Sequence, residues 1–138
     1  MQHAADTSFS PEQRAEAYVV LASKAWYCSN AITDLPANKE TIVKGNSDIV
    51  HYHRPADDAD FLKAQQCAQN GLELVEMAII LAPDNLAAWS YKLNLLIERI
   101  NLAEMDRRFS EKALFTKQLE EARKRTEELN AKDQKQRP

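Results

Sequence analysis

Two histidines separated by one residue are the first side chains of this sequence that could bind a metal. His51 and His53 flank Tyr52, and three aspartates follow within residues 57–60. Imidazole and carboxylate groups are ligands for zinc and similar ions, but this spacing matches no specific motif. Two of the aspartates are also explained as caps of a following helix. We therefore interpret His51, Tyr52 and His53 as contacts for a partner or as packing over helix ends, with a metal-binding protein acting through His51 and His53 as an alternative.

The two cysteines are the second pair of residues with chemical potential. Cys28 lies near the end of one predicted helix and Cys67 lies early in the next, so an antiparallel helix pair could bring them together. A disulfide would require an oxidising compartment, and we favour two buried thiols that act as small apolar side chains. No serine or cysteine has a recognisable base and orienting acid, and no pair of carboxylates stands out. The sequence therefore predicts neither an enzyme nor a cofactor.

Length and composition favour one small helical domain. The chain has 138 residues, of which 44% are hydrophobic and 28% are charged, and its net charge is -3. This balance provides enough apolar side chains for a core and does not indicate a surface that binds nucleic acid. Gly45 and Gly71 are the only glycines, which excludes Gly-rich phosphate-binding loops and argues against a sheet with many tight turns. We predict a single all-α domain over residues 1–138.

The sequence contains no segment typical of membrane insertion or secretion. Its longest apolar run, residues 77–82, is far shorter than the roughly 20 residues that cross a bilayer. Residues 1–6 lack the charged start and the apolar core of a secretory signal. We therefore expect no membrane span and assign no compartment, and export stays open if the chain is a trimmed fragment.

Four helices are predicted from capping residues and from apolar side chains at three- and four-residue spacing. Ser10, followed by Pro11 and Gln13, combines the features of a helix start. Pro83-Asp84-Asn85 ends one helix and caps the next. The predicted helices cover residues 11–31, 57–82, 86–103 and 110–131. We expect the polar end of the chain to fray.

Residues 34–55, between the first two predicted helices, form a long insert without helical periodicity. Thr41-Ile42-Val43 and Ile49-Val50 are short β-branched runs on either side of Lys44-Gly45-Asn46-Ser47. These runs could pair as a small hairpin or belong to an irregular loop. The sequence leaves both alternatives open.

Residues 71–89 resemble the junction between successive tetratricopeptide repeats. The resemblance rests on the small residue Gly71, the turn Leu81-Ala82-Pro83-Asp84-Asn85 and Trp89 early in the following helix. Tyr18 and Trp89 resemble the aromatic starts of two repeats, but they are 71 residues apart instead of about 34. The insert accounts for the excess. The resemblance implies antiparallel helical hairpins stacked as about two repeats, similar to the C-terminal part of a longer bacterial array.

The resemblance also implies a scaffold or adaptor that binds a protein or peptide and has no catalytic activity. Tetratricopeptide proteins bind partners in the groove that the first helices of the repeats line. In this sequence the groove corresponds to eight residues: Val19, Ser23, Trp26, Tyr27, Ser90, Asn94, Ile97 and Glu98. Trp26 and Tyr27 could anchor a partner, although aromatic residues at helical spacing are also typical of a core.

A structural self-assembly domain is the alternative function. Two repeats are fewer than the roughly three that a stable array needs, so missing upstream repeats or a second copy of the chain could complete the core. The apolar stripe of the fourth predicted helix or the exposed face of the first would then form the interface.

Overall fold

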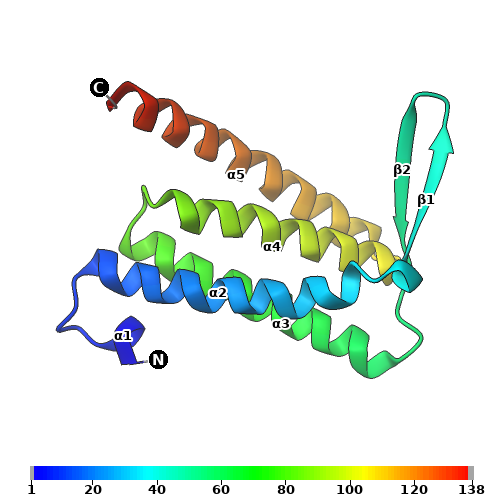
Figure 1. Ribbon diagram of the computed structural model, residues 1–138, viewed down its shortest axis with the longest axis horizontal. Coiled ribbons are helices and arrows are strands. Elements are labelled where there is room, and N and C mark those ends of the chain that lie inside the picture. Colours follow the sequence, from blue (N-terminus) through cyan, green and yellow to red (C-terminus); the bar gives the residue numbers. More distant parts are fainter. Residues whose placement is uncertain (1, 137–138) are drawn as a thin grey trace.

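Four long helices and one β-hairpin make up the computed structural model, which describes residues 2–136 (Figure 1). The long helices are α2 (Pro11–Thr33), α3 (Asp58–Leu81), α4 (Leu86–Met105) and α5 (Phe109–Gln136), preceded by one helical turn, α1 (Gln2–Ala5). The insert contains a 3-10 turn, η1 (Pro36–Asn38), and the strands β1 (Lys39–Lys44) and β2 (Ser47–Tyr52). The predicted antiparallel helix pairs are confirmed, and the chain is mostly helical rather than all-α because the insert forms two strands.

Local signals in the sequence explain where the helices begin. The Ser10 hydroxyl accepts a hydrogen bond from the Gln13 backbone N–H, and the Gln13 side chain accepts one from the Ser10 N–H, which closes a capping box. Asp57 and Asn85 accept backbone N–H groups at the starts of α3 and α4. All four predicted helices are present. The sequence pattern does not predict α1, and the expected fraying of the chain end is wrong because α5 continues to Gln136.

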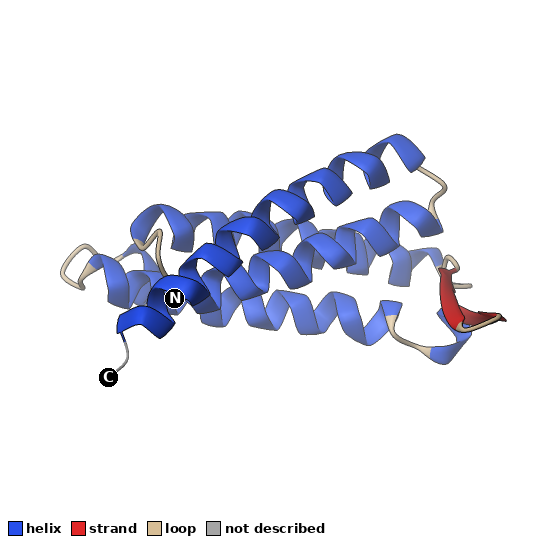
Figure 2. Ribbon diagram, turned by 90° about the horizontal axis from the view of Figure 1, so that it is seen from above, coloured by secondary structure: helices blue, strands red, loops and turns tan. Residues whose placement is uncertain are grey.

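The helices form two antiparallel pairs, and α4 of the second pair also joins it to the first. α2 packs against α3, α4 packs against α5, and α4 also contacts both helices of the first pair. Figure 2 shows the hairpin at one end of this helical body. The order of packing therefore follows the order of the chain, with the insert as a projection between α2 and α3.

Small side chains allow the first three long helices to approach closely. One core cluster combines buried residues of α2, α3 and α4: Ala15, Val19, Ala22, Val75, Ala78, Ala88 and Leu95. Gly71 lies at the tightest point, because a Cβ added there would be 2.5 Å from Leu95 Cδ2 and 3.1 Å from Ala25 Cβ. A second cluster lies towards the hairpin and contains Ile32, Phe61, Ala64, Ala68, Leu102 and Met105.

A disulfide joins Cys28 of α2 to Cys67 of α3. The two Cα atoms are 5.9 Å apart, which is within the range that a disulfide spans. The preference for two separate thiols is therefore wrong, because the antiparallel packing of α2 on α3 sets the two positions opposite each other. The bond links positions 39 residues apart, so it restricts the unfolded chain strongly.

The insert forms the hairpin rather than the irregular loop. β1 and β2 are antiparallel, with Ile42 opposite Ile49 and with Gly45 and Asn46 as the two-residue loop. Gly45 has a φ of +60°, which a Cβ would disfavour, and a glycine at this first loop position is typical of a type II′ turn. The hairpin base lies against α4 through β2, and its tip projects from the body (Figure 1).

Candidate partner-binding surface

An aromatic pair on α2 is the most prominent feature of the predicted groove. The rings of Trp26 and Tyr27 form an edge-to-face contact, with centroids 5.0 Å apart and planes at 66°. Tyr27 is 65% exposed, whereas Trp26 is half-buried and packs against the first core cluster. Trp26 therefore supports the Tyr27 ring from the body, and Tyr27 offers apolar area and a hydroxyl group to a partner.

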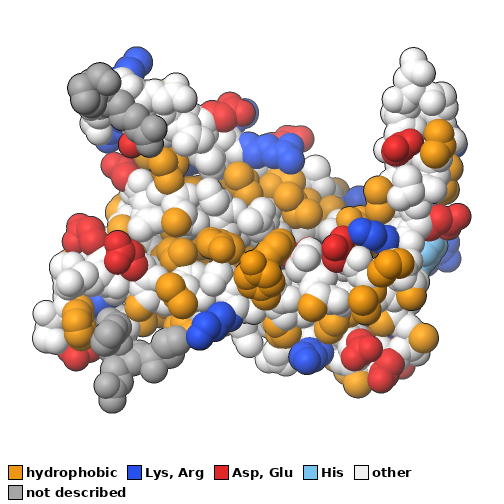
Figure 3. Space-filling model, viewed as in Figure 1, with side chains coloured by type: hydrophobic (Ala, Val, Ile, Leu, Met, Phe, Trp, Pro, Cys, Tyr) orange, Lys and Arg blue, Asp and Glu red, His pale blue; other side chains and the backbone are white. Residues whose placement is uncertain are grey.

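Six of the eight predicted groove residues are at least partly exposed on α2 and α4, and we call them the α2–α4 face: Ser23, Trp26, Tyr27, Ser90, Asn94 and Ile97. Figure 3 shows hydrophobic side chains gathered across the middle of the molecule where these two helices run. The Ser23 hydroxyl donates to the Val20 carbonyl oxygen of its own helix at 2.6 Å. Ile97 is the exposed aliphatic side chain that α4 contributes.

The other two predicted groove residues are buried, so the prediction that they line an open groove is wrong. Val19 follows Ala15 by four residues and precedes Ala22 by three, and this helical face forms the first core cluster. Glu98 is only 2% exposed, because it is turned towards α2. A partner on the surface cannot contact either side chain directly.

Glu98 is held by three side chains from the last turns of α2. Its Oε1 atom accepts hydrogen bonds from the hydroxyls of Ser29 and Thr33, both at 2.7 Å, and its Oε2 atom accepts one from Asn30 Nδ2 at 3.2 Å. These donors replace the water that the buried carboxylate loses, and they fix α4 against α2. Nothing in the helical pattern alone indicates this role, although Glu98 lies three residues after one buried leucine and four before another.

Glu104 connects the hairpin to the helical body. Its carboxylate accepts hydrogen bonds from the Tyr52 backbone N–H at 2.8 Å and from Lys112 Nζ at 2.7 Å. Partial burial raises the pKa of Glu104, but the two hydrogen bonds and the charges of Lys112 and His51 outweigh it, so the net pKa is lowered. The Tyr52 ring packs against the second core cluster, and burial, opposed by Lys39, raises its pKa. Tyr52 thus packs over the helix ends, which is one of the two roles expected for it.

The two histidines are exposed and lie beside one carboxylate. His53 Nε2 is 3.3 Å from Glu40 Oε2, and His51 lies opposite Glu40 in the strand register. Asp57 caps α3 and Asp58 forms an ion pair, so these aspartates serve the helix start. Within residues 2–136, no group of three or more His, Cys, Asp or Glu side chains could hold a metal ion.

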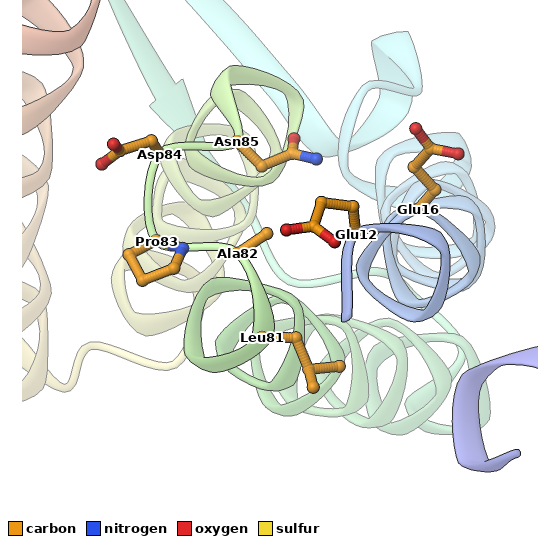
Figure 4. Close-up of a pocket in the computed structure, with 7 residues that line it drawn as sticks. All are labelled: Glu12, Glu16, Leu81, Ala82, Pro83, Asp84 and Asn85. Carbon is orange, nitrogen blue, oxygen red and sulfur yellow. The ribbon is translucent and has the colours of Figure 1, made fainter. Parts of the chain in front are cut away.

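An acidic pocket of about 660 Å³ opens between the start of α2 and the α3–α4 turn (Figure 4). The Glu12 carboxylate points into this space, whereas the Glu16 carboxylate points away from it. Asp84 pairs with Arg125 at 2.9 Å, and Asn85 caps α4. Two of the polar side chains therefore already serve the fold, and the acidic rim does not indicate a particular ligand.

A second hollow of about 690 Å³ lies between α3 and α5 over α4. Its lining combines apolar and charged side chains: Leu72, Glu73, Glu76, Met77, Lys92, Leu96 and Gln118. Lys92 Nζ forms an ion pair with Glu76 at 2.7 Å and lies 5.1 Å from the centre of the Trp89 ring. These contacts join α3 to α4, and no sequence motif marks this region.

Comparisons with protein-family models, with curated proteins and with solved structures find no match for this chain. Among the helices of residues 2–136, none is long and apolar enough to cross a membrane. The function of the chain therefore has to be inferred from its own surfaces. The α2–α4 face is the surface on which an exposed aromatic ring has a rigid support.

Proposed function

We propose that the chain is a tetratricopeptide-like scaffold or adaptor module that binds a protein or peptide segment on the α2–α4 face and has no catalytic activity. The exposed ring of Tyr27 beside Trp26 is the observation that carries this proposal. Asn30 lies about one turn after Tyr27, and Glu98 directly follows Ile97. Asn30 of α2 and Glu98 of α4 are hydrogen-bonded to each other. Tyr27 and Ile97 therefore lie close to a point at which the two helices are in contact.

The packing of the helices supports a repeat-like interpretation. α2 and α4 are the first helices of the two antiparallel pairs, and they contact each other as the first helices of successive tetratricopeptide repeats do. Gly71 allows α3 to approach both of them, which agrees with the small residue at that place in the resemblance. The insert then interrupts the first repeat without separating its two helices, since the disulfide and the core clusters join α2 to α3.

The composition of the face indicates the kind of partner. Tyr27 and Ile97 provide an apolar centre, and Ser23, Ser90 and Asn94 provide hydroxyl and amide groups at its sides. The face contains no lysine or arginine, so recognition of an acidic terminus is not expected. We infer a partner segment that inserts an apolar or aromatic side chain and hydrogen-bonds through neutral groups. Burying an exposed aromatic anchor of this size contributes about 2 kcal/mol to binding.

Peptides selected from a random library displayed on phage test the proposal. Their binding is compared between two variants that carry two substitutions each. The test variant carries Tyr27→Ala and Ile97→Ser, and the matched control carries Leu62→Ala and Ile80→Ser on the outer side of α3, where Ile80 is 71% exposed. Circular dichroism and melting curves verify that both variants fold. Peptides selected on the wild type should keep their affinity for the control and lose it about tenfold or more for the test variant. Equal binding to both variants contradicts the proposal.

Self-assembly through the apolar stripe of α5, the alternative function, has less support than partner binding on the α2–α4 face. Leu119, Ala122 and Leu129 of the α5 stripe are buried within the molecule. Leu119 and Ala122 form a core cluster with Leu96 of α4. This stripe completes the core of a single copy.

We also propose that the module works in an oxidising compartment, because disulfides persist there and are reduced in the cytosol. Rapid alkylation of the protein as it is extracted from its source cells tests this proposal. Cys28 and Cys67 should resist alkylation until a reductant is added. Alkylation of both residues without a reductant contradicts it.

A further inference from the structure

The β-hairpin exposes apolar side chains on both of its strands. Val43 is 72% exposed, and Ile49 and Val50 are each 40% exposed. A two-stranded hairpin is only marginally stable in water, whereas three or more strands stabilise one another. An open strand edge is also a template for a further strand. Pairing with a further strand would therefore stabilise the hairpin, and its open edge has the geometry for it.

The strand register determines which backbone groups point away from the hairpin. In an antiparallel pair, the backbone N–H and C=O groups of successive residues alternate. One residue hydrogen-bonds the partner strand, and the next points its backbone groups outward. Lys44 and Ser47 flank the two-residue loop and therefore face each other. The Tyr52 N–H faces outward, because it donates to Glu104 of α4. By the same alternation, the outward-facing residues of β1 are Lys39, Thr41 and Val43.

The two edges of the hairpin differ in accessibility. β2 lies against α4, and the bond from Tyr52 to Glu104 occupies the base of its outer edge. β1 lies on the side of the hairpin away from α5 (Figure 1). The outer edge of β1 is thus the better place for another strand.

We propose that β1 pairs with β1 of a second copy of this chain, which creates a four-stranded antiparallel sheet around a two-fold axis. A symmetric pairing has to match outward groups with outward groups. This condition is met when Ile42 lies opposite Ile42 of the second copy. The backbone of Thr41 then exchanges two N–H···O hydrogen bonds with the backbone of Val43 of that copy. The same register sets Glu40 opposite Lys44 of the second copy, and the symmetry repeats this pair.

Charge complementarity favours a second copy as the occupant of this edge. Opposite charges directly across two strands are stabilising, whereas like charges are destabilising. A symmetric pairing through β2 cannot set Asp48 opposite His51 of a second copy. The backbone groups of Asp48 point outward and those of His51 point towards β1, so the two residues never face each other in such a register. The β1 register also aligns Ile42 and Ile49 with their counterparts in one apolar row across the sheet. Pairing through β1 therefore joins matched charges and matched apolar side chains.

Sedimentation velocity over a dilution series from about 1 mM to about 1 µM tests the proposal on the full chain. The wild type should change from dimer to monomer on dilution. Thr41→Pro removes an outward N–H of β1 and should weaken the dimer at least tenfold. Val50→Pro removes an outward N–H of β2 in the same way and should leave the dimer intact. A wild type that is monomeric throughout, or equal loss in both variants, overturns the proposal.

Charge exchange tests the register separately. Glu40→Lys alone and Lys44→Glu alone set like charges opposite each other, and each should weaken dimerisation several-fold. The double variant restores opposite charges and should dimerise like the wild type. A double variant as weak as the single ones contradicts the register. The Tyr27→Ala, Ile97→Ser variant should dimerise normally, so this proposal and the proposed partner binding fail independently.

Discussion

The helical body and the β-hairpin are stabilised in different ways. In the body, buried apolar clusters, a disulfide and a buried carboxylate connect α2, α3 and α4. The hairpin is attached at its base through Tyr52 and Glu104, and most of its strand residues are exposed. Changes inside the body should therefore alter the stability of the whole chain, whereas changes at the hairpin tip should stay local.

Two carboxylates of α4 illustrate the same difference within one helix. Glu98 is buried and accepts hydrogen bonds from neutral donors of α2, so it belongs to the body. Glu104 is partly exposed and binds Lys112 and the Tyr52 N–H, so it belongs to the hairpin attachment. Identical side chains thus have different consequences, because their burial and their donors differ.

Removing the disulfide is expected to give the largest loss of stability. Cys28→Ser combined with Cys67→Ser releases a constraint that spans 39 residues, and the unfolding free energy should fall by about 4 kcal/mol. Urea denaturation followed by circular dichroism measures this loss. Reduction of the wild type serves as the control and should give a similar value. A loss below about 1 kcal/mol would mean that the disulfide is not a main source of the stability of the helical body.

Removing the donors of Glu98 should have the next largest effect. Ser29→Ala combined with Thr33→Val leaves the Oε1 atom of a buried carboxylate without its two hydroxyl partners. The unfolding free energy should fall by about 3 kcal/mol. Ser23→Ala is the matched control, because its hydroxyl bonds only its own helix, and it should change stability by less than about 0.5 kcal/mol. Similar losses of unfolding free energy in both variants would contradict a special contribution of the buried hydrogen bonds to Glu98.

Glu104→Gln should give a smaller effect that depends on pH. The variant weakens the attachment of the hairpin, and the loss at neutral pH should be about 1 kcal/mol. Folding lowers the pKa of Glu104 from its ordinary value of 4.5. Its stabilisation is therefore complete above this ordinary value and is lost as the pH falls through the lowered one. Urea titrations at neutral and acidic pH should give curves for wild type and variant that converge in acid. A constant difference would rule out the charge as its source.

Gly45→Ala should have the smallest effect on global unfolding. The alanine strains a residue at a φ of +60°, which costs about 1 kcal/mol locally. Because the loop lies outside the core clusters, global stability should change by less than about 0.5 kcal/mol. Amide hydrogen exchange should nevertheless become faster in β1 and β2. A drop in global stability as large as the local strain would show that hairpin and body unfold together.

The sequence predicts the features that depend on neighbouring residues and misses those that depend on distant ones. The capping box at Ser10 and the turn at Pro83 are local, and the helices begin where these residues predict. The sequence leaves the hairpin as one of two alternatives, because the hydrogen bond that anchors it comes from Glu104, 52 residues away in the chain. The pairing of Cys28 with Cys67 similarly depends on which faces of α2 and α3 meet.

The site residues divide along the same line. Helical spacing brings Trp26, Tyr27 and Ile97 to partly or fully exposed positions on neighbouring helices. The same spacing does not distinguish the inner edge of that face from its surface, so it predicts Val19 and Glu98 in the groove although both are buried. The donors of Glu98 come from α2, and only the contact between α2 and α4 reveals that this carboxylate is buried.

The most direct test of the proposed function is a map of where a bound peptide lies. A peptide selected on the wild type is titrated into isotope-labelled protein, and the backbone amide shifts are followed by NMR. We expect the largest shifts around Tyr27 on α2 and around Asn94 and Ile97 on α4, with β1 and the outer side of α3 unchanged. Shifts concentrated in the hairpin or around the hollow between α3 and α5 would contradict binding on the α2–α4 face.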